Sequence, residues 1–221
     1  MEIRVLYEDN HVIAAYKPAG VLVQKGEAGG HDDDTLYWQV KQFIKRRDDK
    51  PGDAFLGVLH RLDRPVSGIV LFAKTSKGAA RLSEQFRAHT IVKIYHAVVH
   101  GKVSEPRGSL IHFLIKDQEK KKAIIGRTGD KSILHYEVVR SNFDFSLLKI
   151  RLETGRFHQI RAQLSHEGHP IAGDAKYGSS DPRPDGSICL AATELRFAAA
   201  TSGETVMVSH PYPPEWEKYV S

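Results

Sequence analysis

The feature that most constrains the fold is an apolar run, Ser67–Ala73, which follows Pro65 and ends at Lys74. An uninterrupted apolar segment of this length is typical of a buried strand. Pro65 and Gly68 favour a turn that leads into this strand. We therefore expect residues 67–73 to form a central, buried strand.

A carboxylate stands between two arginines just before this strand, in the segment His60-Arg61-Leu62-Asp63-Arg64. Two nearby positive charges favour the ionised form of an acid, so Arg61 and Arg64 are expected to lower the pKa of Asp63. The result is a charged carboxylate on a loop at the edge of a rigid element. Taken alone, the pattern is also typical of a structural ion pair, which is common on protein surfaces.

The composition is typical of a soluble globular protein of ordinary size. The 221 residues (24.7 kDa) are 41% hydrophobic and 27% charged, enough for one sizeable core and short for two ordinary domains. We predict one domain over residues 1–221. No apolar run approaches the ~20 residues of a membrane span, and the N-terminus has no signal-peptide layout. The expectation is a cytoplasmic monomer with no membrane contact.

Charge and cysteine content narrow the class of partner. The net charge is +5 and the pI is about 9.2, which favours a polyanionic partner because neutralised phosphates release counterions. Many soluble proteins are equally basic. Cys189 is the only cysteine, which excludes an intrachain disulfide and a cysteine-rich zinc site and agrees with a reducing compartment.

Periodicity predicts strands interspersed with a few helices. Strands are expected at residues 5–6, 12–15 and 93–101, and an antiparallel hairpin at 133–139 and 145–152. A first helix follows Thr35 as N-cap and a second follows Ser76. Polar loops are expected at residues 26–34 and 48–53. The apolar positions of the two helices are Leu36, Val40, Phe43 and Ile44, and Ala79, Leu82 and Phe86.

Two groups of basic residues suit a phosphate backbone. One lies on the first expected helix and the other on a strand and loop at residues 108–127. Either group could instead be a solvated face that keeps the protein soluble. The residues are Lys41, Lys45, Arg46 and Arg47, and Lys116, Lys120, Lys121 and Lys122.

Four further motifs occur along the chain: Lys17-Pro18-Ala19-Gly20, Lys93-x-Tyr95, the stretch from Thr154 to Leu164 (TGRFHQIRAQL) and the stretch from Gly173 to Gly178 (GDAKYG). Gly155 ends the preceding strand, and the residues after it are expected to form a helix. Phe157, Ile160 and Leu164 would share one face of that helix, so that Arg161 flanks the packed side.

Together with HRLD-R, these motifs resemble those of the RluA-type pseudouridine synthases. The order and spacing of HRLD-R, K-x-Y and T-G-R-x-H-Q-I-R make the combination highly specific. One departure is Tyr16, which stands where the family has asparagine. The resemblance implies an α+β fold with a mixed, largely antiparallel sheet, flanking helices and loops, and an active-site cleft across the sheet.

The resemblance also implies the catalytic residues. Asp63 matches the catalytic aspartate, and an arginine of the third motif pairs with it. Arg161 is assigned to that pair, with Arg156 as the alternative. Tyr95 would stack on the flipped uracil and is a candidate for proton transfer. The G-D-x-x-Y-G stretch is interpreted as structural support for the Arg161 helix.

Further residues are expected to contact the RNA substrate. Arg61 would contact the backbone or fill the space that the flipped base leaves, and Ile160 would line the pocket beneath the base. Arg64, Lys93 and Arg156 complete the expected set. His166 and His169 are three residues apart beside Gly168, unlike the helical pair of a zinc protease, so no metal site is predicted.

Isomerisation of uridine to pseudouridine requires no metal or organic cofactor. The enzyme breaks the N1–C1′ bond, rotates the uracil and rejoins it through C5. Asp63 could attack C1′ or C6, or assist loss of the C2′ proton to give a glycal. A nucleosidase is one rival function, although no second acid stands out beside Asp63 as a glycoside hydrolase requires. A non-catalytic RNA-binding module is the other.

No appended basic module precedes Ile3, so the catalytic domain is expected to recognise structured RNA by itself. Folded RNA is recognised chiefly by its shape and by splayed loop bases. The HRLD-R-P-x-S-G form resembles module-less relatives that act on tRNA. We therefore expect tRNA as the first substrate and a stem-loop of 23S rRNA as the second.

Overall fold

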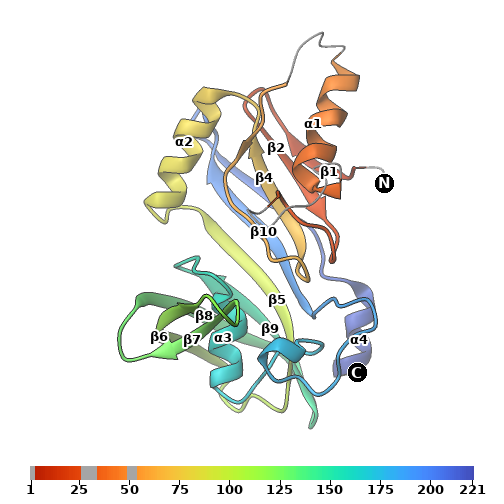
Figure 1. The fold of residues 1–221 in the computed structure, drawn as a ribbon, viewed down its shortest axis with the longest axis vertical. Helices are drawn as coiled ribbons and strands as arrows, with labels where there is room; N and C mark the ends of the chain where they lie inside the picture. The colour runs from red at the N-terminus through yellow and green to blue at the C-terminus, as the bar shows by residue number, and fades with distance from the viewer. Residues whose placement is uncertain (1–2, 26–33, 49–53) are drawn as a thin grey trace. The chain divides into compact units, whose positions relative to one another are not determined.

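The computed structural model describes residues 3–25, 34–48 and 54–221. The loops expected at residues 26–34 and 48–53 lie mostly outside the described residues. The chain divides into two compact units (Figure 1). Unit 1 consists of Met1–Ile91 and Glu194–His210, and unit 2 of Val92–Thr193 and Pro211–Ser221. The single domain over residues 1–221 stays a prediction.

The sheet of unit 1 is built on the expected buried strand. This strand, β4 (Ser67–Ala73), is buried along its whole length. It pairs antiparallel with β2 (Val12–Lys17) from Val12 opposite Ala73 to Lys17 opposite Gly68. The other strands are β1 (Val5–Glu8), the two-residue β3 (Gly57–Val58), β11 (Thr205–Ser209) and β10 (Leu190–Ala198), which begins in unit 2.

Two helices in unit 1 begin with threonine caps. The Thr35 side chain accepts a hydrogen bond from the Trp38 amide at 3.2 Å at the start of α1 (Leu36–Arg47), as the sequence predicted. The predicted cap of α2 (Ser76–Arg87) was wrong by one residue. Thr75, not Ser76, has the extended backbone that a cap needs, and its hydroxyl accepts from the Gly78 amide at 3.0 Å.

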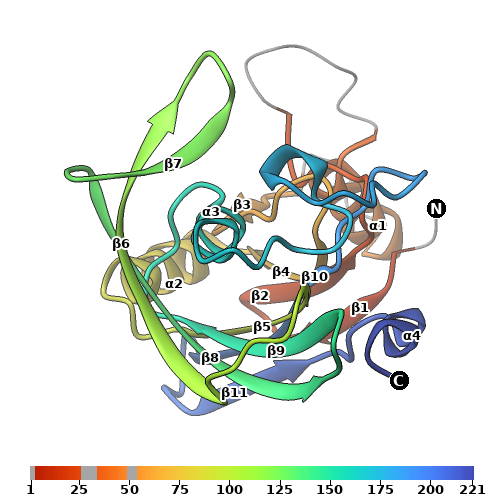
Figure 2. The same ribbon diagram turned by 90° about the horizontal axis from the view of Figure 1, so that it is seen from below.

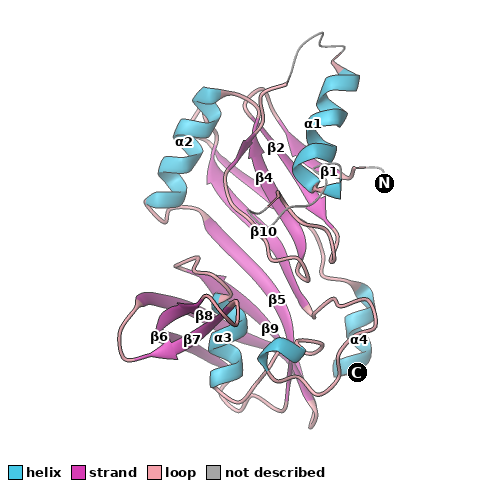
Figure 3. Cartoon of the chain, viewed as in Figure 1, coloured by secondary structure: helices cyan, strands magenta, loops and turns pink. Residues whose placement is uncertain are grey.

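The core of unit 1 joins α2 to the sheet. Alternate residues of β2 and β4 bring their side chains to one face, and Leu82 of α2 packs there with apolar residues of β10 and β11. Figure 3 shows α1 and α2 beside the strands of this unit. The buried cluster includes Val12, Ala14, Ile69, Leu71, Leu82, Leu195, Phe197 and Val208.

Unit 2 contains the predicted hairpin within a sheet of strand order β5–β9–β8–β6–β7. The hairpin strands pair from Leu134 opposite Leu152 to Ser141 opposite Ser146. Figure 2 shows this sheet curving around α3. The elements are β5 (Val92–His100), β6 (Arg107–Asp117), β7 (Lys122–Gly126), β8 (Asp130–Ser141), β9 (Phe145–Leu152), α3 (Gln159–His166), η2 (Ala175–Tyr177), η3 (Pro214–Trp216) and α4 (Glu217–Val220).

The predicted fold class is confirmed. Helices and strands are mixed along the chain, and all the strand pairs that have a described register are antiparallel. The lysines near residues 116–122 lie, as expected, around the tip of the β6–β7 hairpin. In the described part of the chain, no helix is long and apolar enough to cross a bilayer.

Candidate active site

Asp63 lies on a tightly anchored loop between β3 and β4 in unit 1. Its carbonyl accepts a hydrogen bond from the Val66 amide at 3.1 Å, which closes the turn into β4. The neighbouring Leu62 is buried. His60 fixes the start of the loop, because its Nε2 accepts from the Leu71 amide of β4 at 3.0 Å. The partly exposed Asp63 side chain therefore projects from a backbone that is held on both sides.

Lys17, at the end of β2, anchors the same loop through hydrogen bonds to backbone carbonyls. Its side chain is fully buried, and Nζ donates to the carbonyls of Pro18 at 3.0 Å, Val21 at 2.7 Å and Arg64 at 3.1 Å. Three acceptors match the three N–H groups of an ammonium ion. Burial lowers the pKa of Lys17 to about 7, against the opposing effect of the Asp63 charge.

Arg64 serves as a tether to the Lys-Pro-x-Gly turn. Its Nε donates to the Gly20 carbonyl at 2.9 Å, and the Gly20 amide donates to the Arg64 carbonyl at 2.8 Å. Gly20 has φ of +86°, a conformation that favours glycine. Among the described residues, neither Arg64 nor the exposed Arg61 forms an ion pair with Asp63, because the Arg64 guanidinium reaches the turn instead.

Tyr16, which stands where the family has asparagine, makes a contact between aromatic rings. The Tyr16 and His210 rings stack with centroids 4.5 Å apart. An asparagine amide at this position would act through hydrogen bonds, whereas Tyr16 acts on its neighbour through a ring face.

Arg161 lies at the centre of a buried network in unit 2. Its side chain is 5% exposed, and the partner carboxylate of Asp174 is 1% exposed. Nε and Nη2 donate to the two Asp174 oxygens at 2.7 and 2.8 Å, and the Tyr177 ring lies 5.0 Å from the guanidinium carbon. Asp174 and Tyr177 belong to the G-D-x-x-Y-G stretch, so the predicted support for the Arg161 helix is confirmed.

His158 completes this network as a neutral imidazole. Burial and the positive charge of Arg161 lower the pKa of His158 to about 3. Its Nε2 lies 3.2 Å from Arg161 Nη1, which can only donate, so Nε2 is the acceptor. Nδ1 therefore carries the proton and donates to the Tyr177 hydroxyl at 2.9 Å.

The turn before α3 is held by two side chains of the third motif. The Gln159 Oε1 accepts from the Thr154 hydroxyl at 2.8 Å and from the Arg156 amide at 3.0 Å. Its Nε2 donates to the Ile133 carbonyl at 3.1 Å, and the Ile133 amide donates to Thr154 at 2.9 Å. These bonds tie the turn between β9 and α3 to Ile133 of β8, and thereby help to fix the position of Arg161.

Other residues of this motif differ from the expected helix face. Ile160 and Leu164 are buried as predicted, but Phe157 is 40% exposed. The expectation for Phe157 was wrong because α3 begins only at Gln159, and the ring stacks on His158 instead, at 3.8 Å. The Arg156 side chain is 44% exposed, with Nη1 3.4 Å from Asp130.

Lys93 and Tyr95 lie two residues apart on β5, so they share one face of the strand. Both are largely buried. Burial lowers the pKa of Lys93. The Lys93 amine lies beside Gly155 of the third motif: a side chain added to Gly155 would place its Cβ 3.6 Å from Lys93 Nζ.

The structure thus groups the predicted residues within each unit. Asp63, Arg61 and Arg64 share unit 1, and the remaining five lie in unit 2. No individual role was predicted from the sequence for Lys17, His158 or Asp174, although each lies inside a recognised motif. A site that joins Asp63, Tyr95 and Arg161 stays a prediction. The residues in unit 2 are Lys93, Tyr95, Arg156, Ile160 and Arg161.

One group of side chains in unit 2 has the spacing of metal ligands. His112, His166 and Glu167 each place a ligand atom within 4.8 Å of the others. His166 and His169 are the pair whose spacing was compared with that of a zinc site in the sequence. In the structure, the Nδ1 of His169 lies 2.9 Å from the His100 carbonyl instead. His112 Nε2 lies 3.1 Å from a carboxylate oxygen of Glu167, so these two side chains contact each other directly.

Comparison with known proteins identifies the family. A sequence model of the family described as RNA pseudouridylate synthase matches residues 11–166. Ribosomal large subunit pseudouridine synthase D of Xanthomonas campestris is 32% identical over 232 residues, which cover 99% of this chain and 69% of that relative. tRNA pseudouridine synthase C of Yersinia pestis is 32% identical over 243 residues, with 99% and 90% covered.

The fold agrees with this assignment. The structure of human RNA pseudouridylate synthase domain containing 1 matches with a TM-score of 0.78 at 24% identity, over 100% of this chain and 88% of the other. The chain belongs to the RNA pseudouridylate synthase family and is an RluA-type member, an isomerase that acts on RNA.

Proposed function

We propose that this enzyme isomerises specific uridines in structured RNA, with Asp63 as the catalytic carboxylate. The observation that carries the proposal is the anchoring of the Asp63 loop. Lys17 donates to the Arg64 carbonyl and Arg64 exchanges two hydrogen bonds with Gly20. The Lys17–Gly20 turn thus holds the short loop that carries Asp63, as a catalytic group requires if it is to meet its substrate in a fixed geometry.

The reaction rearranges one nucleotide without a change of composition. The target uridine leaves the helical stack, the N1–C1′ bond breaks, and the uracil turns so that C5 bonds to C1′. N1 gains a proton and C5 loses one, so atoms balance. Asp63 either attacks C1′ or C6, or assists removal of the C2′ proton. A substrate deuterated at C2′ separates the routes, because only the glycal route breaks that C–H bond.

Residues of unit 2 receive supporting roles in this proposal. Arg161 keeps Asp63 ionised and oriented, and Tyr95 stacks on the flipped uracil. Support for Arg161 comes from its rigidity, since Asp174 and Tyr177 fix its guanidinium. Ile160 would line the pocket beneath the base. Arg61, Arg64, Lys93 and Arg156 would contact the RNA. The three exposed ones, Arg61, Arg64 and Arg156, carry positive charge that would attract a phosphate backbone.

We propose tRNA as the first substrate and a stem-loop of 23S rRNA as the second. The matched part of the Yersinia pestis tRNA enzyme is 90% of that enzyme. Almost the whole of that enzyme therefore aligns with this chain, which supports the preference for tRNA. For the Xanthomonas campestris large subunit enzyme, the matched part is 69%.

Two experiments test the activity and the substrate. Purified enzyme is incubated with RNA, and the nucleosides are analysed by mass spectrometry. A pseudouridine of unchanged mass supports the isomerase, whereas released uracil supports a nucleosidase. Mapping of pseudouridine in all stable RNAs of a strain that lacks the gene then identifies the substrate, and loss confined to rRNA would reverse our order of preference.

A further inference from the structure

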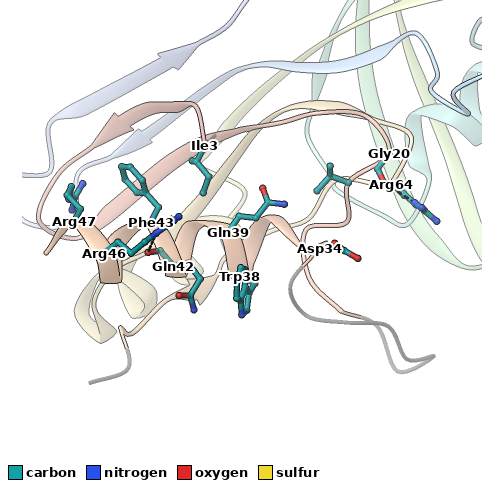
Figure 4. Close-up of a pocket in the computed structure, with 11 residues that line it drawn as sticks. Ile3, Gly20, Asp34, Trp38, Gln39, Gln42, Phe43, Arg46, Arg47 and Arg64 are labelled. Carbon is teal, nitrogen blue, oxygen red and sulfur yellow. Dashed lines mark hydrogen bonds between the residues drawn. The ribbon is translucent and has the colours of Figure 1, made fainter. Parts of the chain in front are cut away.

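A cavity of about 940 Å³ lies along one side of α1 in unit 1 (Figure 4). The roles assigned above leave it unused. Its lining includes Trp38, Gln42 and Arg46 of α1, together with Gly20 and Arg64 of the two turns beside Asp63. The cavity therefore adjoins the loop that carries the catalytic carboxylate.

The lining residues of α1 form one stripe. Trp38, Gln42 and Arg46 are four residues apart, so they lie above one another on the same side of the helix. At 1.5 Å per residue, the stripe extends over ~12 Å, a length that suits a short piece of single strand. In Figure 4, Arg64 and Gly20 lie at one end of the row and Arg46 at the other.

Two guanidinium groups of the cavity are not neutralised by acids. Arg46 Nε donates to the Gln42 carbonyl at 3.3 Å, and Arg64 Nε donates to the Gly20 carbonyl. In the part of the chain that the structure describes, neither arginine has a carboxylate partner, so both keep terminal N–H groups for an anion. Arg47 differs, because it pairs with Glu8 at 2.5 Å and with Asp48 at 2.7 Å.

The remaining groups suit an unpaired base better than a duplex. Trp38 is half-buried, and its indole N–H has no hydrogen-bond partner among the described residues. Gln39 and Gln42 line the cavity with amides that can donate to and accept from a base edge. Asp34 also lines it, which interrupts the positive rim and limits it to one or two phosphates. An aromatic ring between cationic side chains is the usual arrangement for single-stranded RNA.

We propose that this cavity binds one or two unpaired nucleotides beside the target uridine, with a base on Trp38 and phosphates on Arg46 and Arg64. The proposal rests on the function proposed above, because it places loop nucleotides next to Asp63. It explains how α1 contributes to RNA recognition although it carries no catalytic residue. An acidic peptide is the competing ligand, but glutamate and aspartate side chains have no ring to stack on the indole face.

Fluorescence tests the stacking directly, because the chain has two tryptophans. Trp216, in unit 2, is 2% exposed. In the Trp216→Phe variant, the emission of Trp38 should fall saturably when an unpaired uridine hexamer is added. In Trp38→Phe, whose remaining tryptophan is buried, the hexamer should cause no change. A matched RNA duplex or a glutamate hexapeptide that quenches Trp38 equally well would overturn the proposal.

A charge variant with a matched control tests the phosphate contact. Arg46→Gln should weaken binding of the RNA substrate by about threefold to tenfold and reduce the salt slope of binding by about one. Arg87→Gln is the control, because Arg87 is also an exposed arginine in the last turn of a unit 1 helix, α2. Equal behaviour of the two variants would contradict the proposal.

The outcomes separate this inference from the proposed function. If the wild type forms pseudouridine but Arg46→Gln and Trp38→Phe match it in KM, the cavity proposal fails and the function stands. If Trp38 is quenched by unpaired RNA while the wild type forms no pseudouridine, the nucleotide site stands and the proposed reaction fails.

Discussion

The Asp174 carboxylate accepts two hydrogen bonds from Arg161, one from Nε at 2.7 Å and one from Nη2 at 2.8 Å. Both side chains are almost fully buried. This bidentate contact fixes the plane of the guanidinium and leaves Nη1 toward His158. Arg161 is therefore a rigid cation, held by an acid thirteen residues further along the chain.

Asp174→Ala should destabilise the protein by about 3–5 kcal/mol, because it removes the bidentate carboxylate from the buried Arg161 cation. Urea unfolding followed by circular dichroism measures the loss. Asp130→Ala is the matched control, since Asp130 pairs with the exposed Arg156 at 3.4 Å, and it should cost less than about 1 kcal/mol. Similar losses in the two variants would show that the Arg161–Asp174 pair contributes no more than a surface contact.

Lys17 should make the stability depend on pH. Its pKa is about 7 in the folded protein, against 10.5 for an ordinary lysine. Between these values the unfolded chain binds more protons than the folded one, so the contribution of Lys17 to the free energy of unfolding rises with pH in this window. Below about pH 7 both states are protonated and the contribution is constant.

The Lys17→Met variant tests this assignment. It removes the titrating group while it keeps a long side chain. The difference in unfolding free energy between wild type and variant should change in favour of the wild type by about 1 kcal/mol per pH unit above pH 7. Urea unfolding at pH 6.5, 8 and 9 provides the comparison. A constant difference over this range would show that Lys17 has an ordinary pKa in the fold.

The sequence predicted most of the fold because its signals are local. The apolar run of β4, the alternation in β9 and the Thr35 cap each act within a few residues. The wrong positions were boundaries. Thr75 and Ser76 are both suitable caps, and only the backbone conformation decides between them. The Phe157 expectation failed because the helix begins after it.

The site was predictable only as far as the motifs name residues. Asp63 and Arg161 stand out in sequence by their motifs. Lys17 does not, because its role depends on the backbone carbonyls of Pro18, Val21 and the distant Arg64, and no residue pattern records carbonyl positions. The Arg64 side chain likewise bonds a backbone oxygen, of Gly20, instead of the carboxylate beside it in the sequence.

Arg161→Ala should reduce both activity and stability, and its effect should depend on Asp63. If Arg161 keeps the Asp63 carboxylate ionised, the pKa of that acid rises once the guanidinium is removed. A double-mutant cycle with Asp63→Asn measures the coupling. We expect the losses in unfolding free energy to differ from their sum by more than about 0.5 kcal/mol. Simple additivity would mean that the two side chains do not interact.

Tyr95 should act on the substrate through its ring. Tyr95→Phe keeps the ring, so RNA affinity should remain within about twofold of the wild type. Tyr95→Ala removes the stacking surface and should cost about 1–3 kcal/mol of binding. Filter binding with the RNA substrate distinguishes the variants. Equal affinity of the alanine and phenylalanine variants would exclude stacking. If Tyr95→Phe keeps its RNA affinity but loses kcat, the hydroxyl takes part in proton transfer.

The most direct test of the catalytic role of Asp63 is the amount of pseudouridine formed by wild type and Asp63→Asn. The substitution removes the charge and keeps the shape, so circular dichroism and RNA affinity should hardly change. Product is mapped chemically on RNA treated with the same preparations. The wild type should convert its target uridine and the variant should convert none. Turnover by Asp63→Asn at a rate near that of the wild type would remove Asp63 from the catalytic role.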